Sequence, residues 1–78
     1  MVEKNIIKQW INEEYNDYMA VQIKDNFVRM TNGSMAYAVD IYSEGSSFIL
    51  EGERYGETIT DSCDANKKAL MKTLSKNI

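Results

Sequence analysis

The residue types that usually perform catalysis near neutral pH are scarce in this chain. It has no histidine, the side chain that most often serves as a general base and as a zinc ligand. Its one cysteine, Cys63, therefore has no histidine to deprotonate it, and the neighbouring Asp61 and Asp64 oppose formation of a thiolate. We expect Cys63 to be a small, partly buried side chain, and we expect the protein not to be an enzyme.

Carboxylates are the most numerous charged groups, and several lie close together in the sequence: Glu44, Glu51, Glu53, Glu57 and Asp61. Paired carboxylates can hydrolyse glycosides or bind a cation. However, no Asp-x-Asx-x-Asx-Gly calcium loop occurs, and residues 52–56 lack the Gly-Lys-Ser/Thr sequence of a phosphate loop. A solvated strand face explains these acids better, so we expect no metal and no cofactor.

Aromatic and aliphatic residues among these acids indicate a binding surface instead. Tyr42 and Ile49 fall on the strand face that should point away from the helices, and Glu51 and Glu53 share that face. Tyr55 lies nearby in a loop-like stretch. An aromatic patch bordered by acids is typical of protein-binding surfaces. We interpret these five residues as candidate partner-binding residues.

A helix at each end of the chain should position this surface. The apolar side chains of the first helix recur with a period of 3.6 and lie on one side of it: Val2, Ile6, Ile7, Trp10 and Ile11. We expect this helix to end near Glu14 and Trp10, the only tryptophan, to pack on the sheet.

The second helix is expected to start at Asp61-Ser62, which has the composition of an N-cap, so that Cys63 and Asp64 would lie in its first turn. Its apolar positions are Ala65, Ala69, Leu70, Thr73, Leu74 and Ile78. Its lysines lie outside this stripe: Lys67, Lys68, Lys72 and Lys76.

Between the helices, apolar and polar residues alternate with a period of two, which predicts antiparallel strands. The clearest hairpin joins residues 35–42, through a turn at 43–47, to a strand with Phe48 and Leu50 in the core. Residues 18–24 and 27–31 are interpreted as strands joined at Asp25-Asn26, although one bent strand or a long loop would also fit.

Other turn signals punctuate the same region. The Asn-Gly pair within residues 31–34 is typical of a type I′ turn. Gly52 and Gly56 indicate a bulge or bend, and residues 58–60 should either prolong the last strand or form an edge.

Together these elements predict a single small α+β domain over residues 1–78. An N-terminal helix, a meander of three or four antiparallel strands and a C-terminal helix (αβββα or αββββα) would form a two-layer sandwich. Both helices should cover one side of the sheet, facing the odd-numbered residues of 35–42. No apolar run reaches the roughly 18 residues that span a bilayer, and one cysteine cannot form an internal disulfide. We therefore expect a cytoplasmic protein with no membrane partner.

The charge of the chain favours a protein as its partner. The net charge is −3, made of −6 in residues 1–61 and +3 in residues 62–78. An acidic body disfavours general affinity for nucleic acid and steers towards a basic protein surface. We expect a non-enzymatic protein-binding or inhibitory module, such as a phage or mobile-element inhibitor of a host nucleic-acid-handling protein.

Two alternatives fit the same residues. The order αβββα is similar to that of the double-stranded RNA-binding domain, although the last helix would begin with the acidic stretch 61–64, and only Lys67-Lys68-Ala69 is like that family. RNA would then contact the four lysines of the second helix. The other alternative is a homodimeric structural protein that pairs through an edge strand or an exposed apolar face.

Overall fold

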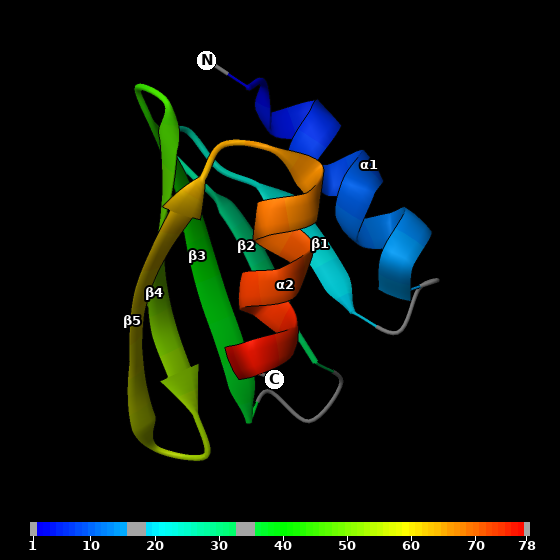
Figure 1. The fold of residues 1–78 in the computed structure, drawn as a ribbon. Helices are drawn as coiled ribbons and strands as arrows, with labels where there is room; N and C mark the ends of the chain where they lie inside the picture. The colour runs from blue at the N-terminus through cyan, green and yellow to red at the C-terminus, as the bar shows by residue number, and fades with distance from the viewer. Residues whose placement is uncertain (1, 16–18, 33–35, 78) are drawn as a thin grey trace.

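The computed structural model describes residues 2–15, 19–32 and 36–77 of the chain. Its elements run in the order α1 (Lys4–Tyr15), β1 (Ala20–Ile23), β2 (Val28–Thr31), β3 (Tyr37–Glu44), β4 (Ser47–Arg54), β5 (Glu57–Asp64) and α2 (Lys67–Asn77) (Figure 1). The strands form one antiparallel sheet of five strands in sequence order. The predicted α+β class is confirmed, with five strands where three or four were expected.

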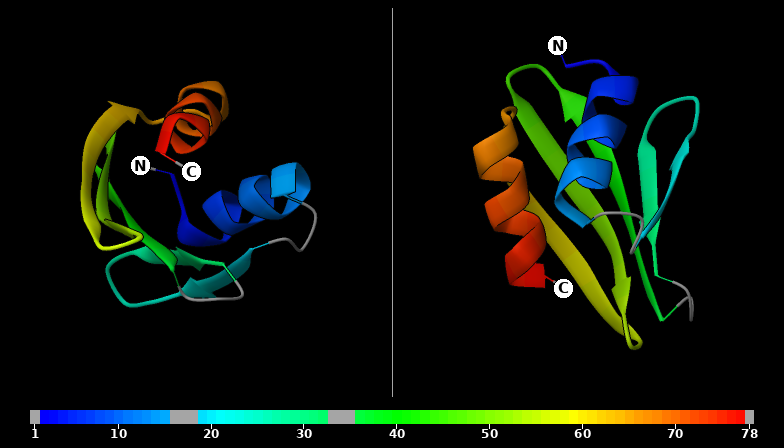
Figure 2. Two further views of the ribbon diagram at one scale, coloured as in Figure 1. Left: turned by 90° about the horizontal axis from the view of Figure 1, so that it is seen from below. Right: turned by 90° about the vertical axis from the view of Figure 1, so that its right-hand side faces the viewer.

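Both helices cover the same face of the sheet, and the sheet curves around them, so that its other face is convex (Figure 2). The helices contribute Ile7, Ile11, Leu70 and Leu74 to the buried core. The sheet contributes Val28, Met30, Tyr37, Val39, Ile41, Phe48, Leu50 and Ile59. As predicted, Trp10 packs on the sheet, where its ring meets that of Phe48 edge-on with a centroid distance of 6.4 Å.

The central hairpin follows the alternation in the sequence. Tyr37, Val39 and Ile41 of β3 are buried, whereas the even-numbered residues between them are partly exposed. The turn is tighter than predicted, because Glu44 and Ser47 are direct partners and only two residues join the strands. Gly45 has a φ of 62°, a left-handed conformation that glycine adopts without a steric penalty.

Residues 20–31 form two strands, as preferred from the sequence. The Lys24 N–H donates to the Phe27 carbonyl at 2.9 Å, across the predicted turn at Asp25-Asn26. After β2, the Asn32 N–H donates to the Tyr37 carbonyl at 3.2 Å. The predicted type I′ turn and the predicted strand start at Met35 involve residues 33–35, which lie outside the described part of the chain.

The prediction that Asp61-Ser62 caps the second helix, with Cys63 and Asp64 in its first turn, is wrong. These residues belong to β5, which pairs with β4 along all eight of its residues. The helix begins at Lys67 and is capped by Asn66, whose Oδ1 accepts from the Ala69 N–H at 2.8 Å. Pairing with β4 in the folded sheet outweighs the local tendency of these residues to cap a helix.

Of the two glycines predicted to mark a bulge or bend, Gly56 lies in a turn, whereas Gly52 lies in a regular strand. The register runs unbroken through Gly52, so there is no bulge at this residue. Gly56 belongs to the two-residue turn between β4 and β5, in which Tyr55 and Gly56 have φ values of 53° and 83°. Two successive left-handed residues match the right-handed twist of the flanking strands.

The helices are short: α1 has 12 residues and α2 has 11. Within residues 2–15, 19–32 and 36–77, no helix combines the length and the apolar character needed to cross a membrane.

Candidate partner-binding face

The convex side of the sheet, which we call the open face, carries a row of apolar side chains. Tyr42 of β3 and Ile49 of β4 are direct cross-strand partners. The Phe27 ring, next to the β1–β2 turn, lies 5.1 Å from the Tyr42 ring, centroid to centroid. All three side chains are half-buried although no helix covers them. We call Phe27, Tyr42 and Ile49 the apolar row.

An ion pair lies alongside this row, two residues along the chain from Phe27 and from Tyr42. Arg29 donates to both carboxylate oxygens of its cross-strand partner Asp40, from Nε at 2.8 Å and from Nη2 at 3.0 Å. The guanidinium also lies 5.2 Å from the centroid of the Phe27 ring. The hydrogen bonds to Asp40 raise the pKa of Arg29, so its charge is secure. The bidentate ion pair and the contact of the guanidinium with the Phe27 ring fix the positions of Arg29 and Phe27 in the free protein.

Carboxylates surround the apolar row. On strands β3 to β5 the open face carries five of them and no cation: Asp40, Glu44, Glu51, Glu53 and Asp64. The one cationic residue of these strands, Arg54, shares its row with the buried Tyr37 and reaches the Asn77 carbonyl of α2. Within the described residues, Asp40 is the only one of the five carboxylates with an ion-pair partner. The open face is therefore strongly anionic.

The structure brings together three of the five predicted partner-binding residues. Tyr42 and Ile49 are partners, and Glu51 follows Ile49 on the same face. Glu53 lies one row further along the strand. Tyr55 lies apart in the β4–β5 turn, six residues beyond Ile49 or about 20 Å along the strand, with 77% of its surface exposed.

Sequence reasoning missed five residues of this face: Phe27, Arg29, Asp40, Glu44 and Asp64. The predicted Asp25-Asn26 turn places Phe27 and Arg29 on one strand face, which was the available signal. Their positions beside Tyr42 and Asp40 depend on the β2–β3 register, which no short motif specifies. Asp64 was not expected on this face because it was predicted to lie in the second helix.

The lysines of α2 lie on the other side of the molecule. Lys68, Lys72 and Lys76 recur every four residues and therefore line up along the helix. The Lys76 Nζ lies 3.3 Å from Asp61 Oδ2, and the Lys67 Nζ lies 3.6 Å from Glu13 Oε1. The molecule thus has an anionic convex face and a cationic ridge, Lys68–Lys72–Lys76, on its helical side.

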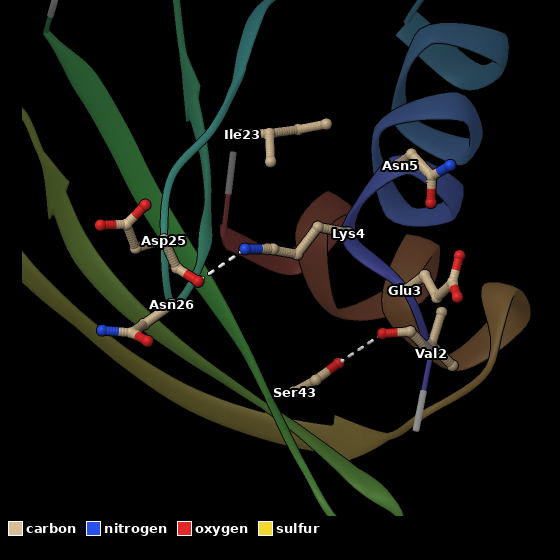
Figure 3. A pocket seen from close by; sticks show the side chains of 8 residues that line it. All are labelled: Val2, Glu3, Lys4, Asn5, Ile23, Asp25, Asn26 and Ser43. Carbon is tan, nitrogen blue, oxygen red and sulfur yellow. Dashed lines mark hydrogen bonds between the residues drawn. The ribbon is translucent and has the colours of Figure 1, made fainter.

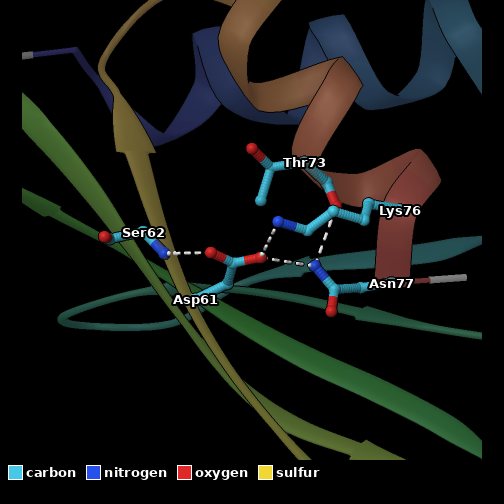
Figure 4. A network of polar contacts seen from close by, with 5 residues as sticks. All are labelled: Asp61, Ser62, Thr73, Lys76 and Asn77. Carbon is cyan, nitrogen blue, oxygen red and sulfur yellow. Dashed lines mark hydrogen bonds and ion pairs between the residues drawn. The ribbon is translucent and has the colours of Figure 1, made fainter.

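Asp61 joins α2 to the edge strand β5 (Figure 4). Its Oδ1 accepts from the Ser62 N–H at 2.8 Å, and its Oδ2 accepts from the Asn77 Nδ2 at 3.0 Å. The Asn77 bond, the Ser62 bond and the ammonium of Lys76 all lower the pKa of this carboxyl. Asp61 is therefore a charged side chain that links β5 to the end of α2.

The remaining reactive groups are held in their neutral forms. Burial raises the pKa of the Cys63 thiol, and Asp61 and Asp64 raise it further, against a hydrogen bond with Thr73 that lowers it. Burial likewise raises the pKa of the Tyr37 hydroxyl. In the part of the chain that the structure describes, no cluster of three or more Cys, Asp or Glu side chains is arranged to hold a metal ion.

A shallow cavity of about 660 Å³ lies between the start of α1 and the β1–β2 hairpin (Figure 3). Lys4 spans it, and its Nζ donates to the carbonyls of Lys24 at 2.7 Å and Asp25 at 2.6 Å. The side chains of Asp25 and Asn26 point away from this ammonium. The ammonium of Lys4 is already bonded to backbone carbonyls, so the arrangement ties the helix to the hairpin and does not assemble a reactive centre.

Comparison of the chain with protein families, with curated proteins and with solved structures found no match.

Proposed function

We propose that the protein is a non-enzymatic binding module that docks its open face onto a basic surface of another protein. The observation that carries this proposal is the excess of negative charge on the convex face, where β3 to β5 carry five carboxylates and no cation, and Arg29 of β2 is bonded to only one of the five. Such a face attracts basic surfaces over a distance and repels anionic ones.

The uncharged part of the face supports the same function. Interfaces are enriched in aromatic residues and arginine, and their central contacts are surrounded by polar groups. Phe27, Tyr42 and Arg29 form such a centre, and their mutual contacts fix their positions. Because the face is convex, a partner with a groove fits it better than a partner with a flat surface does.

Basic grooves are the binding sites of nucleic-acid-handling proteins, so the module would act as an inhibitor that occupies such a groove. This is the manner of action of a phage or mobile-element inhibitor in the host cytoplasm. The single free thiol of Cys63 suits a reducing compartment.

Charge reversal on the open face tests this proposal. Glu51→Lys with Glu53→Lys should slow association with the partner and remove most of its dependence on salt, because both carboxylates face the approaching cations. The matched control is Glu3→Lys with Glu14→Lys, which changes the net charge equally at exposed positions outside the sheet. Equal effects of the two double variants on the association rate would show that net charge alone matters and would overturn the docking surface.

The cationic ridge of α2 supports RNA binding as a second candidate, since Lys68 and Lys72 have no ion pair within the described residues. The likeness to the double-stranded RNA-binding domain is weakened, because five strands separate the helices and α2 does not begin at 61–64. If this candidate holds, Lys68→Glu with Lys72→Glu abolishes binding of duplex RNA, and the open-face variants strengthen it.

Self-association remains a third candidate, because no other described strand pairs with the outer edge of β5. Light scattering over a range of concentrations tests it. A molar mass that rises towards twice the monomer value would favour a dimer over the docking proposal.

A further inference from the structure

Carboxylates border the apolar row on both of its long sides: Asp40 and Glu51 on one, where Asp40 is bonded to Arg29, and Glu44 and Asp64 on the other. Along β4, Glu51 lies two residues after Ile49, and Ser47 lies two residues before it. Ser47 is flanked across the sheet by Glu44 and Asp64. Since a strand rises about 3.4 Å per residue, the two lines of carboxylates, four residues apart on β4, lie about 14 Å apart, with the apolar row midway.

On one side of the row, a carboxylate is left without a cation by the protein itself. Glu51 is the direct partner of Asp40, and like charges opposite one another in a sheet repel. Arg29 neutralises Asp40 through two hydrogen bonds, and no ion pair within the described residues does the same for Glu51. Glu51 is thus placed to receive a cation from outside.

A complementary surface must be concave, with cations on both walls and an apolar or aromatic floor between them. Grooves for single-stranded nucleic acid have this composition, because they pair a cationic track for the backbone with aromatic side chains on which bases stack. Surfaces that bind duplexes lack such a floor, since the bases are already stacked inside the duplex and most contacts go to phosphate and sugar.

We infer that the groove occupied by the open face is one that binds single-stranded nucleic acid; this inference rests on the proposed function. The carboxylates stand where the phosphates of the strand would lie, and the rings of Phe27 and Tyr42 stand where its bases would stack. A second copy of this chain is a poorer occupant, because the lysines of its cationic ridge are exposed on one helix and offer no floor for the apolar row.

A displacement experiment tests the inference. Proteins of the native host are passed over the immobilised chain and over its Glu51→Lys/Glu53→Lys variant, and the protein retained only by the former is purified. That protein is loaded with a fluorescent oligothymidylate or with a fluorescent duplex of the same length, and release is followed by anisotropy as the free chain is added. The chain should release the oligothymidylate competitively and leave any bound duplex in place.

Two tyrosine variants make the test specific to the apolar row. Tyr42→Ala should weaken release at least tenfold, and Tyr42→Phe, which keeps the ring, should release as the unaltered chain does. Tyr55→Ala is the matched control, because Tyr55 is exposed in a turn away from the row. Circular dichroism of each variant separates lost contact from lost folding.

The outcomes separate the inference from the proposed function. Three results would overturn the inference and leave the docking function standing. The retained partner binds no oligothymidylate, or the chain releases only duplex from it, or the folded Tyr42→Ala variant releases oligothymidylate as well as the unaltered chain does. Failure to retain any protein selectively overturns the docking function, and the inference falls with it.

Discussion

Asp61 shows how one residue can serve a different purpose from the one its local sequence suggests. Next to Ser62 it has the composition of a helix cap, yet its carboxylate bonds the Ser62 N–H on an edge strand and the Asn77 amide on a helix. Edge strands leave backbone groups free to pair with other chains, and inward-pointing charges are one protection against this. Asp61 therefore protects the edge of β5 as well as anchoring α2.

The Asp61 contacts make part of the stability dependent on pH. The pKa of this carboxyl is lowered in the folded state, so its contribution is complete above the unfolded value near 3.8 and is lost as the pH falls through the folded value. We expect Asp61→Asn to lower the Tm at pH 7 and the difference from the unaltered protein to shrink below about pH 4. Thermal unfolding followed by circular dichroism from pH 7 to pH 2 measures this.

Asp64→Asn is the control for that series, because Asp64 is exposed and its carboxylate makes no hydrogen bond or ion pair within the described residues. Its Tm should follow that of the unaltered protein at each pH. A deficit in Asp61→Asn that stays constant across the series would contradict the assignment.

Gly52 makes a second prediction at the scale of a residue. A Cβ at this position would lie 2.8 Å from the Cα of Val39 and would also collide with the Ala38 carbonyl, neither of which can move without disturbing β3. Gly52→Ala should therefore lower the free energy of unfolding by about 3 kcal/mol, at the upper end of overpacking costs. Urea denaturation measures the loss.

A comparison with Gly45 separates the cost of a steric clash from the cost of a left-handed backbone conformation. Gly45 is left-handed but has open space around it, so Gly45→Asn should cost less than about 1 kcal/mol, since asparagine tolerates this conformation. Similar losses in the two variants would refute the steric explanation for Gly52.

At the scale of elements, α1 depends on its buried side and not on its intrinsic helical tendency. Ile7 is fully buried and its neighbour Ile6 is 37% exposed, although the two have the same side chain. Short helices are marginal in water, so the packing of one side supplies most of the stability of α1.

The adjacent isoleucines provide a matched pair. Ile7→Ala should lower the free energy of unfolding by about 2–5 kcal/mol through lost burial and the cavity left behind. Ile6→Ala should lower it by less than about 1 kcal/mol, because most of what it removes already contacts water. Urea unfolding of both variants measures the two losses. Equal losses of free energy would show that α1 does not pack on the sheet with Ile7 buried and Ile6 exposed.

At the scale of the whole molecule, the two helices and the sheet share one core. The α1 side chains Ile7 and Ile11, the α2 side chains Leu70 and Leu74 and the ring of Phe48 belong to a single cluster of buried residues. No element can leave this cluster without exposing the others, so the molecule should unfold cooperatively.

This cooperativity is measurable with two probes. Trp10 fluorescence reports the contact of α1 with Phe48, and far-ultraviolet circular dichroism reports both helices and the sheet. The two urea transitions should coincide. A tryptophan transition at lower urea than the circular dichroism transition would show that α1 detaches before the sheet unfolds.

The sequence by itself determined the class of the fold and the layout of the central hairpin. Period-two alternation identified Val39, Ile41, Phe48 and Leu50 as core residues, because side chains on a strand point to opposite faces in turn. The same alternation placed Tyr42, Ile49 and Glu51 on the uncovered face. Helical periodicity likewise placed Ile7 and Ile11 of α1 and Leu70 and Leu74 of α2 on the buried side, but it wrongly placed Ile6 there, which is 37% exposed.

Only the tertiary structure decided how far the sheet extends and what completes the open face. Residues 57–64 carry a weak apolar alternation and a good local cap, and they became a strand because β4 offered a partner along their whole length. Phe27 and Arg29 joined the patch through the register between β2 and β3. Strand pairing joins residues distant in sequence, and its free energy depends on the partner strand, which local sequence patterns do not contain.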